Sequence, residues 1–241
     1  MTLDRYQRDA TPPTRSQAGG DLLRRTLLPA LAVWLVIVGL GFLIRGPLND
    51  LPAEVEVNEA LVGVRGPELN VATQVLSNIG GTHFIIIACA AAMALIFWRT
   101  RQWWFAVVPG IAVAVQSAVF VSSSALIGRE RPDVEHLDDS PPTSAFPSGH
   151  TGASTAFYLT LALLAQRIRN PPLRWAATIL CFAVPALVAF SRLYRGMHHP
   201  ADVVVGAING VICCWLAWRY LRRDTSATQA THPSTAASST T

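Results

Sequence analysis

The chain has no lysine, and charged residues of every kind are scarce in it. Of its 241 residues, 14% are charged and 51% are hydrophobic, and the mean hydropathy is +0.35. Soluble globular domains average about 25% charged residues, so the composition argues against an ordinary soluble domain. A charge in the hydrocarbon core of a bilayer costs several kcal/mol, and chains with many membrane spans are therefore poor in charge. We predict a membrane protein.

Cysteine is scarce as well, and its positions argue against two roles. The four cysteines, which all lie in apolar runs, are Cys89, Cys181, Cys213 and Cys214. They have neither metal-ligand spacing nor a place in an outer loop where a disulfide would form. We interpret them as small packing residues.

Six apolar runs approach the length of about 20 residues that a helix needs to cross a bilayer. They span residues 27–44, 82–98, 103–128, 152–165, 175–190 and 201–218. The fourth run is short, and we expect its helix to begin earlier, at Pro147 or Ser148. The predicted fold class is all-α: a polytopic membrane protein with six transmembrane helices in one bundle, formed by residues 26–223.

Both ends of the chain differ from this apolar middle. Residues 1–25 are mostly polar and contain Pro12-Pro13, and residues 224–241 are a low-complexity segment rich in serine, threonine and alanine. Such segments cannot bury enough apolar surface to offset the entropy lost on ordering. We expect both tails to be disordered.

The arginines predict the orientation in the cell membrane. With the N-terminus in the cytoplasm, both termini are cytoplasmic, and 13 of the 19 basic residues lie on that side, as the positive-inside rule requires. These are Arg5, Arg8, Arg15, Arg24, Arg25, Arg99, Arg101, Arg167, Arg169, Arg174, Arg219, Arg222 and Arg223. The net charge of +4 then belongs to a membrane face and requires no nucleic-acid partner. Four other arginines flank spans on the outer side, in RERP (129–132) and SRLYR (191–195), and this local exception suggests a function.

One further helix is predicted in the outer loop after the first span. Within residues 68–80, apolar residues recur at helical spacing: Leu69, Ala72, Val75, Leu76 and Ile79. A helix that lies along the membrane interface and a helix that packs on the bundle are both compatible with this spacing.

Three polar segments meet at the outer face in this topology. They are GRERP (128–132), FPSGHTG (146–152) and SRLYRGMHHPAD (191–202). The forked guanidinium groups of Arg129 and Arg131 suit phosphate or carboxylate oxygens, although isolated arginines at this depth more often contact lipid headgroups. The acidic, proline-rich stretch between the first two segments could gate the pocket, but we favour an ordinary solvated loop.

The second segment has the features of a helix start. Unpaired backbone N–H groups after Pro147 and Ser148 would form an anion site. Gly149 would allow close approach of the backbone, and His150 could donate a proton to a bound group. An ordinary helix cap is an equally good interpretation of these four residues alone.

The third segment suggests a nucleophile. Pro200 suits the first position of a helix, which puts Asp202 at the third position. A carboxylate there can reach back to His198, accept one ring N–H and leave the other nitrogen free to attack. Arg192 would add another guanidinium. A metal site of His198, His199 and Asp202 is a weaker alternative, because adjacent histidines point in different directions.

Together the segments resemble the signature of the type 2 phosphatidic acid phosphatase family, which shares its fold with vanadium haloperoxidases and bacterial acid phosphatases. The family pattern is a lysine, six residues and Arg-Pro; then Pro-Ser-Gly-His; then Ser-Arg, five residues, His, three residues and Asp. The chain has Arg131-Pro132, the whole of the second motif, and Ser191-Arg192 followed at the family intervals by His198 and Asp202. Each motif is weak alone, but three in the family order are specific.

The resemblance implies a lipid phosphate phosphatase that uses a phosphohistidine and needs neither a cofactor nor a metal. His198 would be the nucleophile, oriented by Asp202, and His150 would be the acid and base. The phosphate oxygens would be held by residues of all three motifs: Arg131, Ser148, Gly149 and Arg192, with help from Arg129. The family lysine, however, falls at Ser124, a departure that bears on substrate affinity and choice more than on reaction type.

The expected substrate is a polyprenyl diphosphate or a phosphatidic acid-like lipid, held in the bilayer with its headgroup at the outer face. A lipid phosphotransferase would use the same residues and pass the phosphoryl group to an acceptor other than water. A vanadate haloperoxidase would share the anion site, but six spans argue against it. A non-catalytic lipid-phosphate-binding protein is an alternative because the lysine is missing, but it would have no use for His150, His198 and Asp202.

Overall fold

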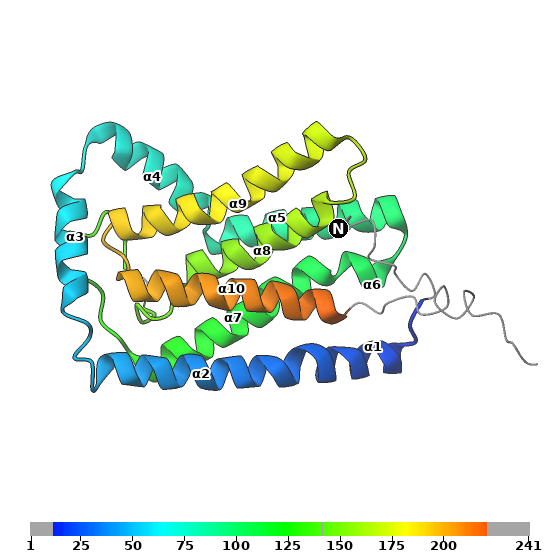
Figure 1. The fold of residues 1–241 in the computed structure, drawn as a ribbon, viewed down its shortest axis with the longest axis horizontal. Coiled ribbons are helices and arrows are strands. Elements are labelled where there is room, and N and C mark those ends of the chain that lie inside the picture. Colours follow the sequence, from blue (N-terminus) through cyan, green and yellow to red (C-terminus); the bar gives the residue numbers. More distant parts are fainter. Residues whose placement is uncertain (1–11, 141, 221–241) are drawn as a thin grey trace, which may run out of the picture.

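The computed structural model describes residues 12–140 and 142–220. Residues 1–11 of the predicted N-terminal tail and the whole of the predicted C-terminal tail (224–241) lie outside them. These residues form helices and no strand (Figure 1). The elements are α1 (Arg15–Leu22), a π-helical segment (Leu23–Leu27), α2 (Leu28–Arg45), α3 (Ala53–Gly63), α4 (Pro67–Ile79), α5 (Thr82–Thr100), α6 (Trp103–Ala106), α7 (Val108–Ile127), α8 (Gly149–Ala165), α9 (Pro171–Tyr194) and α10 (Pro200–Tyr220).

Five helical segments are long and apolar enough to cross a membrane. They are Arg15–Arg45, Thr82–Thr100, Trp103–Ile127, Pro171–Tyr194 and Pro200–Tyr220, and they match five of the predicted spans. Their outer surfaces expose large apolar side chains, among which are those of Leu35, Ile87 and Trp175. Because soluble monomers rarely expose continuous apolar surface of this extent, the helices are those of a membrane-embedded protein.

The fourth predicted span corresponds to α8, which has 17 residues and lies inside the bundle against α7, α9 and α10. Ser148 occupies the N-cap position, directly before the first helical residue Gly149, so the expectation that this helix begins near Ser148 is confirmed. Much of α8 is buried against protein, and Thr155 and Thr160 each donate a hydrogen bond to a carbonyl one turn earlier. These hydroxyls lower the hydropathy of α8 without facing lipid. The total of six spans thus remains a prediction, because it counts α8 as a helix that crosses the membrane.

Small residues let α8 and α10 approach closely. A β-carbon at Gly206 would lie 2.5 Å from the carbonyl oxygen of Ser148, and one at Gly210 would lie 2.6 Å from that of Gly152. Small residues at such contacts are typical of helices packed within membranes. The backbone N–H of Ser148 donates to the carbonyl oxygen of Asp202 at 2.8 Å, and the starts of α8 and α10 are therefore held side by side.

The first helix begins earlier than the sequence predicts, at Arg15, inside the segment expected to be a disordered tail. Thr14 and Gln17 form a reciprocal capping box: the hydroxyl of Thr14 accepts from the N–H of Gln17, and the amide oxygen of Gln17 accepts from the N–H of Thr14. An ion pair one turn apart, Asp21 with Arg25, adds support. Local capping of this kind stabilises a helix end that has no apolar face to bury.

Two helices, α3 and α4, lie at the end of the bundle opposite to the start of α1 and the end of α10 (Figure 1). The helix predicted in the outer loop is confirmed as α4, which packs on α9, whereas α3 was not predicted. In α4 the buried side chains are those of Thr73 and Ser77, and Val71 and Val75 are exposed. The polar side of α4 therefore contacts the protein, and its apolar side faces outward.

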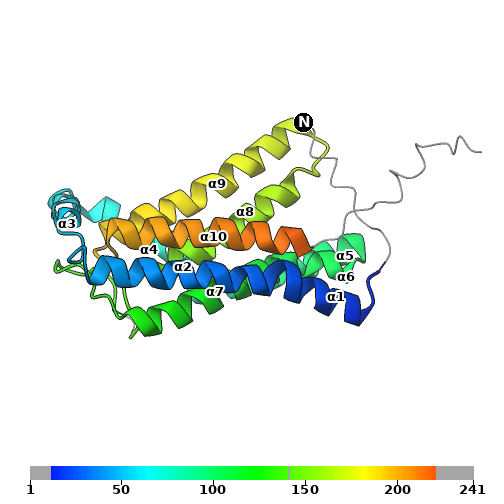
Figure 2. The same ribbon diagram turned by 60° about the horizontal axis from the view of Figure 1, so that its bottom comes forward.

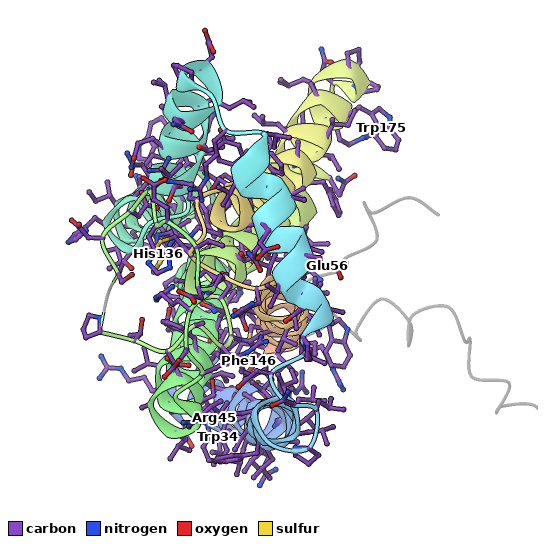
Figure 3. All side chains as sticks on the ribbon, turned by 90° about the vertical axis from the view of Figure 1, so that its left-hand side faces the viewer. Trp34, Arg45, Glu56, His136, Phe146 and Trp175 are labelled. Carbon is purple, nitrogen blue, oxygen red and sulfur yellow. The ribbon has the colours of Figure 1, made fainter. Side chains whose placement is uncertain are left out.

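Contacts of α2 and of Phe146 fix the segment that leads into α8. Helix α2 runs along α7 and α10 (Figure 2). Viewed onto the end that carries α3 (Figure 3), Phe146 lies among the ends of these three helices. Its buried ring packs with Ile37, Ile44 and Ile127. This apolar cluster anchors the segment that leads into the second motif.

Candidate active site

The three motif segments meet at the end of the bundle where α3 and α4 lie. They follow α7, begin α8 and join α9 to α10. A cavity of about 360 Å³ lies there. Four of the predicted side chains line it: those of Arg131, His150, Arg192 and His198. Its remaining wall includes apolar residues of α5 and α7: Ile85, Ile86, Val113, Phe120 and Val121. The cavity thus combines cations and imidazoles with an apolar wall formed by two membrane helices.

His198 is held so that one ring nitrogen remains available. Its Nδ1 lies 2.7 Å from the carbonyl oxygen of Ala145. A carbonyl oxygen only accepts hydrogen bonds, so Nδ1 carries the proton and Nε2 keeps its lone pair. Burial lowers the pKa of His198 to about 4, although the nearby Asp202 carboxylate acts in the opposite direction. The imidazole is therefore neutral near pH 7, the protonation state that a nucleophile requires.

Asp202 differs from its predicted role. Its Oδ2 lies 3.8 Å from Nδ1 of His198, too far for a hydrogen bond. Instead, Oδ2 accepts from the backbone N–H of His199 at 2.7 Å, and Oδ1 accepts from Nη1 of Arg129 at 2.6 Å. The prediction that Asp202 accepts a ring N–H from His198 is wrong in this geometry, because the carbonyl of Ala145 occupies that nitrogen. Asp202 holds the turn that carries the imidazole.

Arg129 is not a cavity residue. Only 2% of its surface is exposed, and its guanidinium forms ion pairs with Asp202 at 2.6 Å, Glu54 at 2.8 Å and Asp50 at 3.3 Å. Burial alone would lower the pKa of Arg129, but Asp202 and Glu54 outweigh it and raise the pKa above its ordinary value. With its donors engaged by acids, the side chain is directed away from the predicted phosphate site.

Helix α3 supplies two side chains that the sequence did not single out. Glu54 pairs with Arg129 and accepts a hydrogen bond from the backbone N–H of Ala201. Asn58, fully buried, donates from Nδ2 to the carbonyl oxygen of His198 at 3.1 Å. Both residues therefore fix the backbone turn on which His198 lies. A weak signal existed, since two polar residues four positions apart share one face of a helix.

The two arginines of the cavity, Arg131 and Arg192, are each held by hydrogen bonds from part of the guanidinium group to protein acceptors. Arg131 donates to the carbonyl oxygens of Met197 and Thr143. Burial lowers the pKa of Arg131, and the Asp202 carboxylate partly opposes that shift. Arg192 donates from Nη1 to the hydroxyl of Ser77 and to Oδ2 of Asp138, both at 2.6 Å. Neither guanidinium has its whole fork engaged by these bonds.

Asp138 joins the loop before α8 to α9. Its carboxylate accepts from Arg192 through Oδ2 and from Nε of Arg195 through Oδ1 at 2.8 Å. These two arginines lower the pKa of Asp138 against the effect of burial, which alone would raise it. Arg195 also donates to Gln74 of α4, so it is a buried structural residue. The loop, expected to be solvated, is docked at Asp138.

The remaining motif residues are placed at the start of α8 and on α7. Gly149 lines the cavity, and a β-carbon there would lie 2.7 Å from the ring of Phe120. The hydroxyl of Ser148 is buried and shares a hydrogen bond with Thr151 at 3.0 Å. Ser124, at the position of the family lysine, is 3% exposed on α7, and its hydroxyl has no hydrogen-bond partner. Among the described residues, no group of His, Cys, Asp and Glu side chains is arranged to hold a metal ion.

Comparisons with known proteins identify the family of the chain. The family model of the PAP2 superfamily matches residues 103–226. The decaprenylphosphoryl-5-phosphoribose phosphatase of Mycobacterium tuberculosis is 33% identical over 171 residues, which cover 69% of this chain and 87% of that protein. The protein with the same name from Mycolicibacterium smegmatis is 35% identical over 163 residues, covering 66% of this chain and 82% of that protein. The chain therefore belongs to the PAP2 superfamily, which confirms the resemblance seen in its motifs.

A solved structure extends the likeness to the fold. The crystal structure of a transmembrane PAP2-type phosphatidylglycerolphosphate phosphatase from Bacillus subtilis superposes with a TM-score of 0.67 at 20% sequence identity. The match covers 84% of this chain and 97% of that chain. The helical bundle is thus that of a PAP2 membrane phosphatase.

Proposed function

We propose that the protein is an integral-membrane phosphatase that removes a phosphate or diphosphate headgroup from a lipid through a phosphohistidine, without a metal. The observation that carries the proposal is the cavity shared by His198, His150, Arg131 and Arg192, in which the free nitrogen of His198 is kept unprotonated. Phosphoryl transfer depends mainly on positioning and charge stabilisation, and these four side chains supply both.

In the first half of the reaction, Nε2 of His198 attacks phosphorus and the bond from phosphorus to the lipid oxygen breaks. His150 gives its proton to that leaving oxygen, and Arg131 and Arg192 hold the other oxygens of the transferred group. In the second half, His150 takes a proton from water, the water oxygen attacks phosphorus, and the phosphorus–nitrogen bond breaks to release phosphate. Proton transfer by a placed histidine contributes typically about 10²–10⁴-fold to the rate.

The apolar wall of the cavity supports a lipid substrate. Ile86 and Val121 line the cavity and are also exposed on the outer surface of α5 and α7, so a hydrocarbon tail could lie there while its headgroup reaches the histidines. The arginine distribution supports a site on the outer side of the cell membrane with both termini in the cytoplasm. A polyprenyl phosphate or diphosphate is the substrate we favour, since related proteins are named for phosphatase activity on a polyprenyl-linked compound.

The test of this function is phosphate release by the purified protein in EDTA from a panel of polyprenyl phosphates, polyprenyl diphosphates and phosphatidic acids. We expect release from at least one of these lipids, and the same yield when acceptor alcohols are added. Transfer of the phosphoryl group to an added alcohol would identify a phosphotransferase instead. Binding of these lipids without any release would identify a binding protein and overturn the proposal.

A stability prediction concerns the carboxylate that joins the two motif arginines. Asp138→Asn should lower the free energy of unfolding by about 2–3 kcal/mol, because it leaves Arg192 and Arg195 buried without their shared anion. Thermal unfolding in detergent would measure the change. Asp139→Asn is the matched control: this neighbour is exposed, and its substitution should alter stability by no more than about 0.5 kcal/mol. Equal effects of the two substitutions would contradict the role given to Asp138.

A further inference from the structure

A second cavity, an apolar groove on the surface of the bundle, lies between α2 and α7. Its volume is about 440 Å³. The two helices lie side by side in both views of the bundle (Figures 1 and 2). Six side chains that neither the motifs nor the proposed reaction uses form its walls: Leu27, Leu31 and Trp34 of α2, and Ala114, Ala118 and Ser122 of α7.

The groove opens toward the lipid. Leu31 is 53% exposed, and the three α7 residues of the other wall are exposed as well. Both helices belong to segments long and apolar enough to cross a membrane. The hydroxyl of Ser122 donates to the carbonyl oxygen of Ala118, so it offers the groove no free donor. The occupant that suits these walls in a bilayer is therefore a hydrocarbon chain.

Only one row of α7 residues separates this groove from the active-site cavity. Val121 lines the cavity and is exposed at the surface of the bundle. Ala118 precedes it by three positions and lines the groove, and residues three apart are neighbours on the surface of a helix. A chain that leaves the cavity over Val121 therefore meets Ala118 and then Ala114. From Val121 to Ala114 the axis of α7 extends about 10 Å, away from the end that carries the first motif.

We propose that this groove binds the distal part of the substrate's hydrocarbon tail, so that the enzyme discriminates between lipid phosphates by the length of their tails. A short tail ends over Val121, whereas a long tail also contacts Ala118 and Leu31. Lipid tails are as apolar as the groove, so the gain comes from van der Waals packing and not from removal of water. This inference rests on the proposed function, because it requires the phosphate to lie among the motif histidines and arginines.

The first test compares geranyl phosphate with solanesyl phosphate, which share an allylic leaving group and differ in the number of isoprene units. With both substrates in the same detergent micelles, wild-type kcat/KM should be about tenfold higher for solanesyl phosphate. Equal values would overturn the inference, and this comparison needs no variant to fold. Ala118→Phe fills the groove and should remove most of the preference, chiefly through a higher KM for solanesyl phosphate. Unequal partition of the substrates into micelles cancels when the ratios of the two proteins are compared.

A matched control and a second variant accompany Ala118→Phe. Ala91→Phe makes the same change on the exposed surface of α5, outside both cavities, and should keep the wild-type ratio. Leu31→Ala lowers the opposite wall at an exposed position, and it should reduce the preference even if the phenylalanine variant does not fold. Retention of the wild-type ratio in Leu31→Ala or in folded Ala118→Phe would overturn the inference. A change of oligomeric state in Ala118→Phe with the ratio retained would assign the groove to a second copy of the chain instead.

The second test measures binding without turnover. The probe is a non-hydrolysable farnesyl phosphonate with a photoreactive diazirine at its free end. Its crosslinks should map to residues 27–34 and 114–122, and excess unlabelled solanesyl phosphonate should abolish them. Crosslinks scattered over the lipid-facing surface would overturn the inference. Crosslinks in the groove of a protein that releases no phosphate from any lipid would refute the proposed function alone.

Discussion

His198→Ala should reduce phosphate release from lipid phosphates by about 10⁴-fold or more, because removal of a nucleophile eliminates the covalent route altogether. The imidazole is buried in the cavity, and its protonated Nδ1 is directed to the carbonyl of Ala145, which leaves only Nε2 for attack. A second measurement is specific for this role. Rapid quenching of the wild-type protein with radiolabelled substrate should trap an acid-labile phosphoprotein, and His198→Ala should trap none.

The adjacent histidine provides a control for this experiment. His199 contributes its backbone N–H to Asp202, a contact that His199→Ala retains. Burial lowers the pKa of His199, and the ring is not part of the cavity wall. His199→Ala should therefore keep phosphate release within about tenfold of the wild-type rate. Loss of the phosphoprotein in His199→Ala, with its retention in His198→Ala, would reverse the assignment of the nucleophile.

Asp202→Asn should both destabilise the protein and weaken its activity. The substitution removes the negative charge paired with Arg129 at 2.6 Å, where the two side chains are 0% and 1% exposed. Breaking a buried pair by removing one partner leaves an uncompensated charge, which typically costs about 3–5 kcal/mol. Because Glu54 and Asp50 still neutralise Arg129 in part, we expect the free energy of unfolding to fall by about 3 kcal/mol, the lower end of that range. Denaturant or thermal unfolding in detergent measures it.

A double-mutant cycle separates this role from the family expectation. If Asp202 acts through Arg129, Asp202→Asn and Arg129→Gln should be strongly non-additive in stability, as is usual for residues in direct contact. Glu56→Gln is the control, because this carboxylate is exposed on α3 and should change stability by no more than about 0.5 kcal/mol. Additive effects of Asp202→Asn and Arg129→Gln would contradict the pairing and return Asp202 to an independent role beside His198.

Much of the fold could be predicted because its signals are local. The length of an apolar run sets the length of a membrane helix, and five of the predicted runs coincide with helices long enough to cross a bilayer. Proline and serine at helix starts placed the beginnings of α8 and α10 correctly. Three elements were not predicted: α1, the π-helical segment that joins it to α2, and α3. Capping and contact with the bundle stabilise these elements more than any apolar periodicity does.

The candidate site was only partly predictable, and Arg129 and Arg131 show why. Both arginines stand in one short segment and carry the same charge, and the sequence offered both as phosphate ligands. Only Arg131 lines the cavity. Arg129 meets Asp50, Glu54 and Asp202, which lie 73 to 79 positions away in the chain. A difference of two residues along an irregular segment changes the direction of a side chain, and no local pattern specifies which direction it takes.

The motifs and apolar runs of the chain were sufficient for its class, its family and the two histidines, His150 and His198, that line the cavity, because spacing along a helix or turn decides these. The tertiary structure alone decided the hydrogen-bond and ion-pair partners of the site residues. The carbonyl of Ala145 orients His198, and the carboxylate of Asp138 holds Arg192. Hydrogen bonds and ion pairs act over about 3 Å, so they depend on how distant helices pack, and that packing is a property of the whole bundle.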